Sequence, residues 1–112
     1  MNINKIRTIS TSDYCGVSIY EDGLKAAAEA NFIAPDWWIS RVVVNPPNRR
    51  NEGIGGKLLE HLKEVIKKRG GETLLVTPGG YGEETERQVR FYRSHGFNNS
   101  CDSYGVLLES KL

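Results

Sequence analysis

The feature that most constrains the fold is a glycine-rich turn between an apolar run and an amphipathic helix. The apolar run spans residues 37–44 and contains three valines in succession with aromatic neighbours, which favours a strand buried on both faces. Pro46 and Pro47 end that strand because neither can donate to a ladder. After the turn, apolar residues recur at the spacing of one helix face: Ile54, Leu58, Leu59, Leu62, Val65 and Ile66. The centre of the chain is therefore a strand–turn–helix unit.

Further strands and a second helix surround this unit. We predict strands over residues 5–9, 14–20, 24–32, 73–77 and 104–111, a hairpin turn at 22–23, and helices over 54–69 and 83–95. Residues 24–32 also have high helix propensity, but the turn before them and Pro35 after them favour a strand. Thr85 and Gln88 have capping-box spacing, which would start the second helix two or three residues later. The order predicts one α/β domain over residues 1–112, with a mixed sheet flanked by helices.

The turn has the composition of an anion-binding site. Gly53, Gly55 and Gly56 leave the backbone amides unobstructed. The helix that follows directs its free N–H groups and its positive dipole end at the turn. Arg49, Arg50 and Lys57 add positive charge on either side. The sequence therefore predicts a phosphate site.

Two well-known phosphate motifs do not fit this turn. A Walker loop requires Ser or Thr after Gly56-Lys57, where the chain has Leu58, and a glycine at the position of Asn51. A dinucleotide fingerprint requires a third glycine at position 58 and should follow its strand at once. Neither an ATP loop nor a dinucleotide loop is therefore expected.

Composition excludes several other classes of protein. Fifteen Lys and Arg against fourteen Asp and Glu argue against a nucleic-acid binder, which would carry a basic excess. The apolar runs are too short to span a bilayer, and no leader pattern stands at the N-terminus, so we expect a cytoplasmic protein. Cys15 and Cys101 lie far apart without metal-ligand spacing, which indicates reduced packing thiols and no bound metal.

Three marks together resemble the GCN5-related N-acetyltransferase (GNAT) superfamily. Residues 50–55 match its acetyl-CoA motif, Arg/Gln-x-x-Gly-x-Gly/Ala, and residues 44–46 match the Val-x-Pro that ends the preceding strand. Tyr92-x-x-x-Gly96-Phe97 matches the end of a later helix in the family. These marks cover residues 37–112 in the family's order, so the chain is identified as a short member.

The chain also departs from the family pattern. The stretch from Pro46 to Gly53 is one residue longer than usual, so either Arg49 or Arg50 can fill the arginine position, and Arg50 keeps the spacing to Gly53. Thr85 stands where the family often has asparagine. The N-terminal part is too short for the usual pair of helices that helps to shape the acceptor site.

The resemblance implies an acetyl-CoA-dependent N-acetyltransferase in which a primary amine attacks the thioester directly, in a ternary complex. It implies a wedge between parallel strands 37–44 and 73–77. The pantetheine arm would pair there with Val42, Val43 and Val44. The pyrophosphate would bind the turn amides of Asn51, Glu52, Gly53, Ile54, Gly55 and Gly56. A backbone N–H near Val42 or Val43 would stabilise the oxyanion, and Tyr92 would protonate the departing sulfur. The alternative for Tyr92 is simple core packing beside Phe91 and Phe97.

Several roles stay open at the level of sequence. The candidates for the general base are Asp36, Glu29, Glu21, His95 and ordered water. Trp37 and Trp38 point to opposite faces of their strand, one into the core and the other as a candidate wall of the acceptor site, which Tyr81 could also flank. The acceptor is an amine-bearing small molecule or protein, and an edge strand could form a homodimer. A non-catalytic CoA-binding regulatory or interaction module on the same fold is the alternative function.

Overall fold

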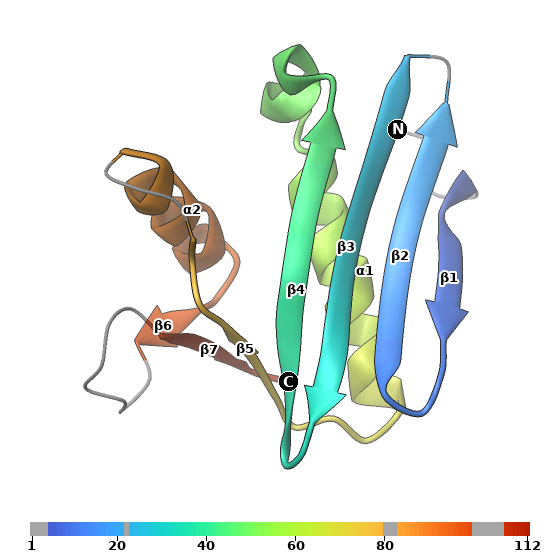
Figure 1. Ribbon diagram of the computed structural model, residues 1–112, viewed down its shortest axis with the longest axis vertical. Coiled ribbons are helices and arrows are strands. Elements are labelled where there is room, and N and C mark those ends of the chain that lie inside the picture. Colours follow the sequence, from blue (N-terminus) through green and yellow to red (C-terminus); the bar gives the residue numbers. More distant parts are fainter. Residues whose placement is uncertain (1–4, 22, 80–82, 100–106) are drawn as a thin grey trace.

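A computed structural model describes residues 5–21, 23–79, 83–99 and 107–112. Within these residues, seven strands form one sheet in the order β1-β2-β3-β4-β5-β7-β6, in which only the β4–β5 pair is parallel (Figure 1). The strands are β1 (Arg7–Ser10), β2 (Tyr14–Glu21), β3 (Leu24–Ile33), β4 (Asp36–Asn45), β5 (Thr73–Val76), β6 (Asn98–Asn99) and β7 (Leu108–Lys111). The helices are the 3-10 helix η2 (Pro47–Glu52), α1 (Ile54–Lys68) and α2 (Glu83–Ser94). The mixed α/β sheet predicted from the sequence is confirmed.

Helix α1 covers one face of the sheet and forms the core with it. Most of its apolar stripe is buried: Leu58, Leu59, Leu62 and Ile66 have no exposed surface, whereas Val65 is half-buried. These side chains pack with apolar residues of β2 and β3 in one continuous cluster. The glycine pair after α1 ends it as predicted, because the N–H groups of Gly70 and Gly71 donate to the carbonyls of residues 67 and 66 in a Schellman motif.

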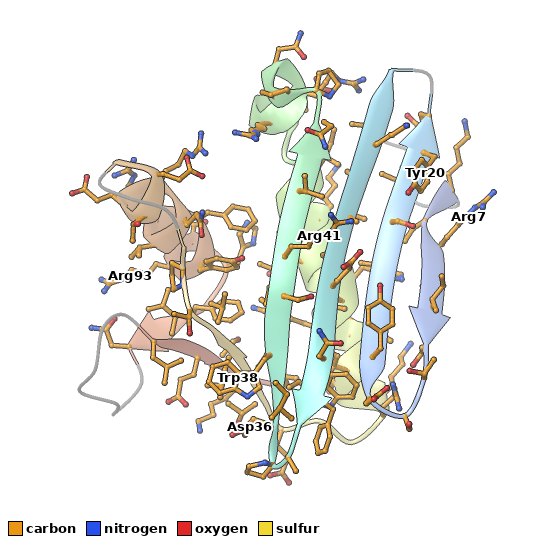
Figure 2. All side chains as sticks on the ribbon, viewed as in Figure 1. Arg7, Tyr20, Asp36, Trp38, Arg41 and Arg93 are labelled. Atoms are coloured by element: carbon orange, nitrogen blue, oxygen red, sulfur yellow. The ribbon has the colours of Figure 1, made fainter. Side chains whose placement is uncertain are left out.

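Among the described residues, no helix covers the opposite face of strands β2–β4 (Figures 1 and 2). The prediction that strand 37–44 is buried on both faces is therefore wrong. Trp37 is buried in the core, whereas Trp38 is only half-buried and Arg41 is exposed on the uncovered face. The two tryptophans do point to opposite faces, as predicted. Strands β1 and β2 are joined by residues 11–13 alone, so the short N-terminal part leaves this face open.

A β-bulge in β4 opens the predicted wedge. Glu29 pairs with Arg41 and Ala30 with Ile39, so Ser40 is an extra residue in β4. Such a bulge bends its strand and increases the local twist. The parallel pairing with β5 is confined to residues 37 and 38 of β4, directly before the bulge. Beyond it the two strands diverge (Figure 1), which confirms the wedge.

Several local predictions are confirmed and others need correction. Residues 24–32 do form a strand, and a two-residue loop joins Glu21 to Leu24, although Asp22 itself lies outside the described residues. Thr85 and Gln88 make no capping box: both bond to the backbone of Gly79, and α2 begins at Glu83. The last strand begins at residue 108, and η2 and β6 are additional elements. Tyr81, Cys101 and residues 104–106 lie outside the described residues, and Cys15 is a buried free thiol.

Candidate functional site

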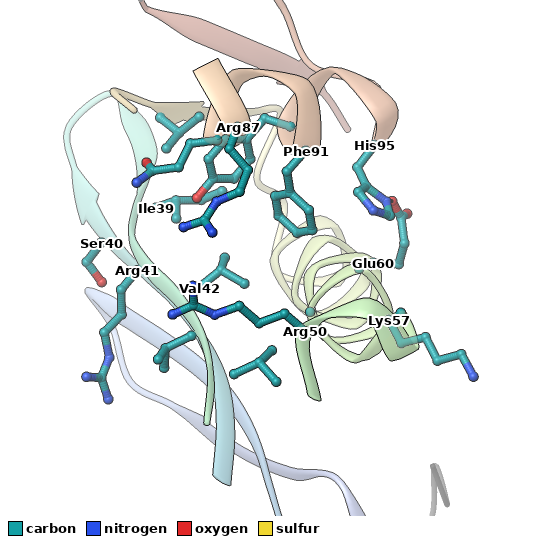
Figure 3. Close-up of a pocket in the computed structure, with 18 of the residues that line it drawn as sticks. Ile39, Ser40, Arg41, Val42, Arg50, Lys57, Glu60, Arg87, Phe91 and His95 are labelled. Carbon is teal, nitrogen blue, oxygen red and sulfur yellow. The ribbon is translucent and has the colours of Figure 1, made fainter. Parts of the chain in front are cut away.

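A cleft with a volume of about 1270 Å³ opens where β4 and β5 diverge (Figure 3). Strand β4 forms one wall, η2 and the first turn of α1 form the floor, and α2 forms the opposite wall. The cleft is lined by these predicted site residues: Val42, Val43, Val44, Arg50, Gly53, Gly55, Gly56, Lys57 and Tyr92. Arg49, Glu52 and Ile54 do not line it, and the side chain of Asn51 is not described. The structure thus gathers residues that lie up to half the chain apart.

The first turn of α1 presents backbone donors with no partner in the helix. Its N-cap, Gly53, has a φ of 75° and no side chain to cap the helix, and no acidic residue stands in the first turn. The first N–H bonded within the helix is that of Lys57, to the carbonyl of Gly53. The N–H groups of residues 54–56 therefore have no intrahelical acceptor. This is the geometry of an anion site.

The two arginines before the turn have different surroundings. Arg49 Nε lies 2.5 Å from Glu52 Oε2, and this hydrogen bond raises the pKa of Arg49 and lowers the pKa of Glu52. Arg50 lines the cleft, and its guanidinium points toward β4 (Figure 3). Lys57 also borders the cleft, but its side chain extends away from β4. Of the two arginines that the sequence left open, Arg50 is the one in the cleft.

The motif Tyr92-x-x-x-Gly96-Phe97 is the C-terminal cap of α2. Gly96 has a φ of 86°, and its N–H donates to the carbonyl of Arg93. The N–H of Phe97 donates to the carbonyl of Tyr92 at 3.1 Å, which completes a Schellman motif. The hydrophobic contact that accompanies this motif is the pair of Phe97 and Tyr92 rings, 5.3 Å apart and edge to face. Tyr92 therefore both packs in the core and borders the cleft.

Burial keeps the Tyr92 hydroxyl protonated. The side chain is 5% exposed, and desolvation raises the pKa of Tyr92 to about 12. At neutral pH this phenol can therefore donate a hydrogen bond into the cleft, and it does not act as a base.

The pKa of Tyr92 predicts a loss of stability in alkali. The folded-state pKa lies above the unfolded value of 10.0, so the unfolded chain loses its proton first. The contribution of Tyr92 to the free energy of unfolding is fully present below pH 10. It falls by roughly 2–3 kcal/mol as the pH rises from 10 to about 12. We expect the difference in free energy of unfolding between the native protein and Tyr92→Phe to fall by this amount, measured by urea denaturation from pH 8 to 12. Parallel curves for the two proteins would contradict the buried, high-pKa phenol.

A protein-family model described as the acetyltransferase (GNAT) domain matches residues 13–99. The chain belongs to the GNAT superfamily. Comparison with curated protein sequences finds no match.

Solved structures with the same fold include two N-acetyltransferases and an anti-CRISPR protein, each of low sequence identity to this chain. The PaiA N-acetyltransferase of Thermoplasma acidophilum, in complex with coenzyme A, is similar with a TM-score of 0.73 and 20% identity over 89% of this chain. This GNAT chain spans 62% of that protein. The ribosomal-protein-S18-alanine N-acetyltransferase of Escherichia coli has a TM-score of 0.69 and 21% identity, over 91% of this chain and 71% of that one. The anti-CRISPR protein AcrVA5 has a TM-score of 0.65 and 21% identity, over 84% of this chain and 96% of that one.

Of the four side chains considered as a general base in this GNAT chain, His95 alone lines the cleft. Glu29 pairs with Arg41 at 3.2 Å on the uncovered sheet face, and Glu21 lies 3.9 Å from Lys5. Asp36 is at the turn between β3 and β4. His95 Nδ1 lies 3.2 Å from Glu60 Oε1 on α1. Trp38, the other candidate wall of the acceptor site, does not line the cleft. Of the four side chains proposed as general base, only His95 is therefore placed to reach a substrate in the cleft.

Sequence reasoning missed the helix residues that complete the cleft of this GNAT chain. They come from the polar side of α1 and from one side of α2: Glu60, His61, Glu64, Glu84, Arg87, Gln88 and Phe91. Each set recurs at three- and four-residue steps from a predicted site residue, Lys57 on α1 and Tyr92 on α2. That spacing is the signal that could have found them.

Two further features are absent from the described ranges of the chain. No group of three or more His, Cys, Asp or Glu residues there is placed to hold a metal ion. Among the same residues, no helix has the length and apolar character needed to cross a membrane.

Proposed function

We propose that this GNAT domain is an acetyl-CoA-dependent N-acetyltransferase that moves an acetyl group to a primary amine by direct attack in a ternary complex. The observation that carries the proposal is the single cleft that joins the uncapped, glycine-lined start of α1 to the β4 edge beyond Trp38, which has no pairing with β5. The similarity in fold to PaiA N-acetyltransferase, solved with coenzyme A, supports it.

In this proposal the cofactor follows the cleft from the turn to the bulge. Its pyrophosphate accepts hydrogen bonds from the amides of residues 54–56, which have no acceptor within α1, and from Arg50. Residues 51 and 52 lie within the 3-10 helix η2, so the predicted set of turn amides is narrowed. Its pantetheine arm pairs with the backbone of β4 at residues 42–44, where β5 has diverged. Hydrogen bonds with a charged partner contribute about 1.5–3 kcal/mol each. Three or four of them account for micromolar affinity, which corresponds to about 8 kcal/mol.

The acetyl transfer then needs an oxyanion donor and help for the leaving sulfur. A backbone N–H of β4 near Val42 or Val43 donates to the oxyanion as the amine attacks the thioester carbon. When the intermediate collapses, the C–S bond breaks and the sulfur leaves with the electron pair. A thiol has a pKa near 8.5, so full proton transfer from Tyr92, with its pKa of about 12, is uphill by roughly 5 kcal/mol. Tyr92 therefore stabilises the thiolate by a hydrogen bond and solvent protonates it.

The amine must lose a proton before or during the attack. An amine of pKa about 10.4 is neutral only about once in 10³ molecules at pH 7. Of the bases considered from the sequence, His95 borders the cleft, and ordered water is another route. The acceptor is an amine-bearing small molecule or a protein amine.

Tyr92→Phe tests the enzyme proposal. We expect the native protein to bind acetyl-CoA in calorimetry and to acetylate members of an amine panel, followed by mass spectrometry with labelled acetyl-CoA. In Tyr92→Phe, kcat should fall by about 10- to 1000-fold because the thiolate loses its donor, while the Kd for acetyl-CoA stays within about twofold.

Other outcomes separate the alternatives. No binding of acetyl-CoA by the native protein would refute the proposal. Binding without transfer to any amine would favour the non-catalytic CoA-binding module. That alternative is motivated by the β4 wall, where residues 39–44 line the cleft without a carboxylate.

A further inference from the structure

Two arginines enter the cleft from different sides, one from its floor and one from the α2 wall. Arg50 comes from η2, next to the glycine turn, and Arg87 comes from α2. Figure 3 shows both guanidinium groups directed into the space beside Val42 of β4. The other described arginines of α2, Arg90 and Arg93, do not line the cleft. The cleft therefore receives positive charge from a wall that the acetyl-CoA motif does not include.

The surroundings hold Arg87 in place across from the turn. Its guanidinium pairs with Glu84 one helical turn before it, and Gln88 Nε2 donates to the other oxygen of the same carboxylate at 3.3 Å. The hydrogen bond from Arg87 is the largest cause that lowers the pKa of Glu84, and the charge of Arg50 also contributes. Arg50 therefore interacts electrostatically with the Glu84–Arg87 pair across the mouth of the cleft.

The positive groups exceed the negative ones at this place. Among the ion pairs of the described ranges, none includes Arg50. The uncapped N-terminus of α1 adds roughly half a positive charge beside it. Two guanidinium groups and the helix dipole outweigh the one carboxylate among them, Glu84, by roughly one and a half charges. A diester pyrophosphate, with two negative charges, would balance this excess.

We propose that Arg87 is a second phosphate-binding residue, which together with Arg50 clamps the pyrophosphate of the acyl carrier between α2 and the glycine turn. The inference rests on the proposed function, since it assumes a CoA-type carrier. The planar guanidinium can donate two parallel hydrogen bonds to one phosphate, which lysine cannot do. Because Arg87 and Tyr92 both belong to α2, the Arg87–pyrophosphate contact also fixes Tyr92 relative to the carrier. A carrier without the pyrophosphate binds without this contact.

Calorimetry of the full chain with three ligands tests the clamp. The ligands are CoA, dephospho-CoA, which keeps the pyrophosphate and lacks the 3′-phosphate, and pantetheine, which has no phosphate. We expect Arg87→Ala to weaken CoA and dephospho-CoA alike, by about 10- to 100-fold. Pantetheine binding should change by less than about twofold, because it has no group for the clamp to hold.

Three variants serve as controls. Arg90→Ala removes the same charge from the same helix outside the cleft and should leave the affinity for all three ligands unchanged. Arg50→Ala marks the effect of losing the other half of the clamp. Arg87→Gln keeps a polar chain of similar reach without the charge, and it repeats the test if alanine alters α2, as circular dichroism would show.

Different failures point to different errors. If Arg50→Ala weakens CoA and Arg87→Ala does not, the clamp is wrong and the proposed function stands. A loss with CoA but not with dephospho-CoA would assign Arg87 to the 3′-phosphate and overturn the pyrophosphate contact. With succinyl-CoA added as a fourth ligand, a loss confined to it would place the anion in the acyl group, which also overturns the pyrophosphate contact. Absence of CoA binding by the native protein would refute both proposals.

Discussion

Gly55→Asp is expected to lower the affinity for acetyl-CoA by at least about 1000-fold while leaving the protein as stable as before or slightly more so. A Cβ at position 55 would lie 3.5 Å from Val44 Cγ2, 3.6 Å from Val42 Cγ1 and 3.7 Å from Phe91 Cε1, which are ordinary contacts. The side chain therefore fits the apo fold. Its carboxylate would satisfy the free N–H groups of the first turn of α1 and occupy the place of the phosphate.

The opposite signs for stability and binding make this variant informative. An acidic residue in the first helical turn contributes about 0.3–1 kcal/mol through the dipole, which thermal unfolding would register as an equal or higher Tm. Calorimetry with acetyl-CoA measures the binding loss. Gly55→Ala is the matched control, because it adds the same Cβ without charge and should lose far less affinity. Equal affinities of the Asp and Ala variants would show that the anion is not held at this turn.

Phe97→Ala is expected to lower the free energy of unfolding by about 3–5 kcal/mol, a large part of the 5–15 kcal/mol typical of a domain. Phe97 is 1% exposed, and its ring lies edge to face against Tyr92. Lys63 Nζ lies 4.8 Å from the centre of the same ring. Truncation leaves a cavity between α2 and the sheet and removes the contact that completes the α2 cap. Urea denaturation measures the effect.

Phe32→Ala is the control for the size of this effect. Phe32 is 37% exposed, and its ring has an edge-to-face partner in Trp37 at 5.4 Å. Its loss should cost about 0.5–1.5 kcal/mol, because more than a third of the Phe32 surface is already exposed to solvent. A similar loss in both variants would mean that Phe97 does not have the core environment described here.

The elements with strong local signals could be predicted from the sequence. The central strand, the glycine turn and α1 follow from apolar periodicity and from the residues that interrupt it. Gly70 and Gly96 end their helices because their positive φ values suit glycine. Elements without a pattern of their own could not be found: η2 is a short 3-10 turn, and β6 is two residues defined only by pairing with β7.

The cleft could be predicted only where it lies within one motif. The glycine turn and Tyr92 belong to local patterns, whereas Arg87 and Glu60 reach the cleft through the packing of helices against the wedge. A helical period shows which side of a helix is polar but not what that side faces. The different roles of Arg49 and Arg50 were more nearly predictable from the sequence. Arg49 and Glu52 are three residues apart, and side chains at that spacing meet in a helical turn.

The extra residue Ser40 changes how β4 alternates along its length. Trp37 and Ile39 contribute to the core before the bulge, and Val42 and Val44 contribute after it, so the buried positions are odd numbers first and even numbers later. A strand of strict two-residue period cannot do this, because its buried positions would all be odd or all be even. If Ser40 were instead paired in a regular ladder, Arg41 and Val43 would face the core and Val42 and Val44 would move to the uncovered face.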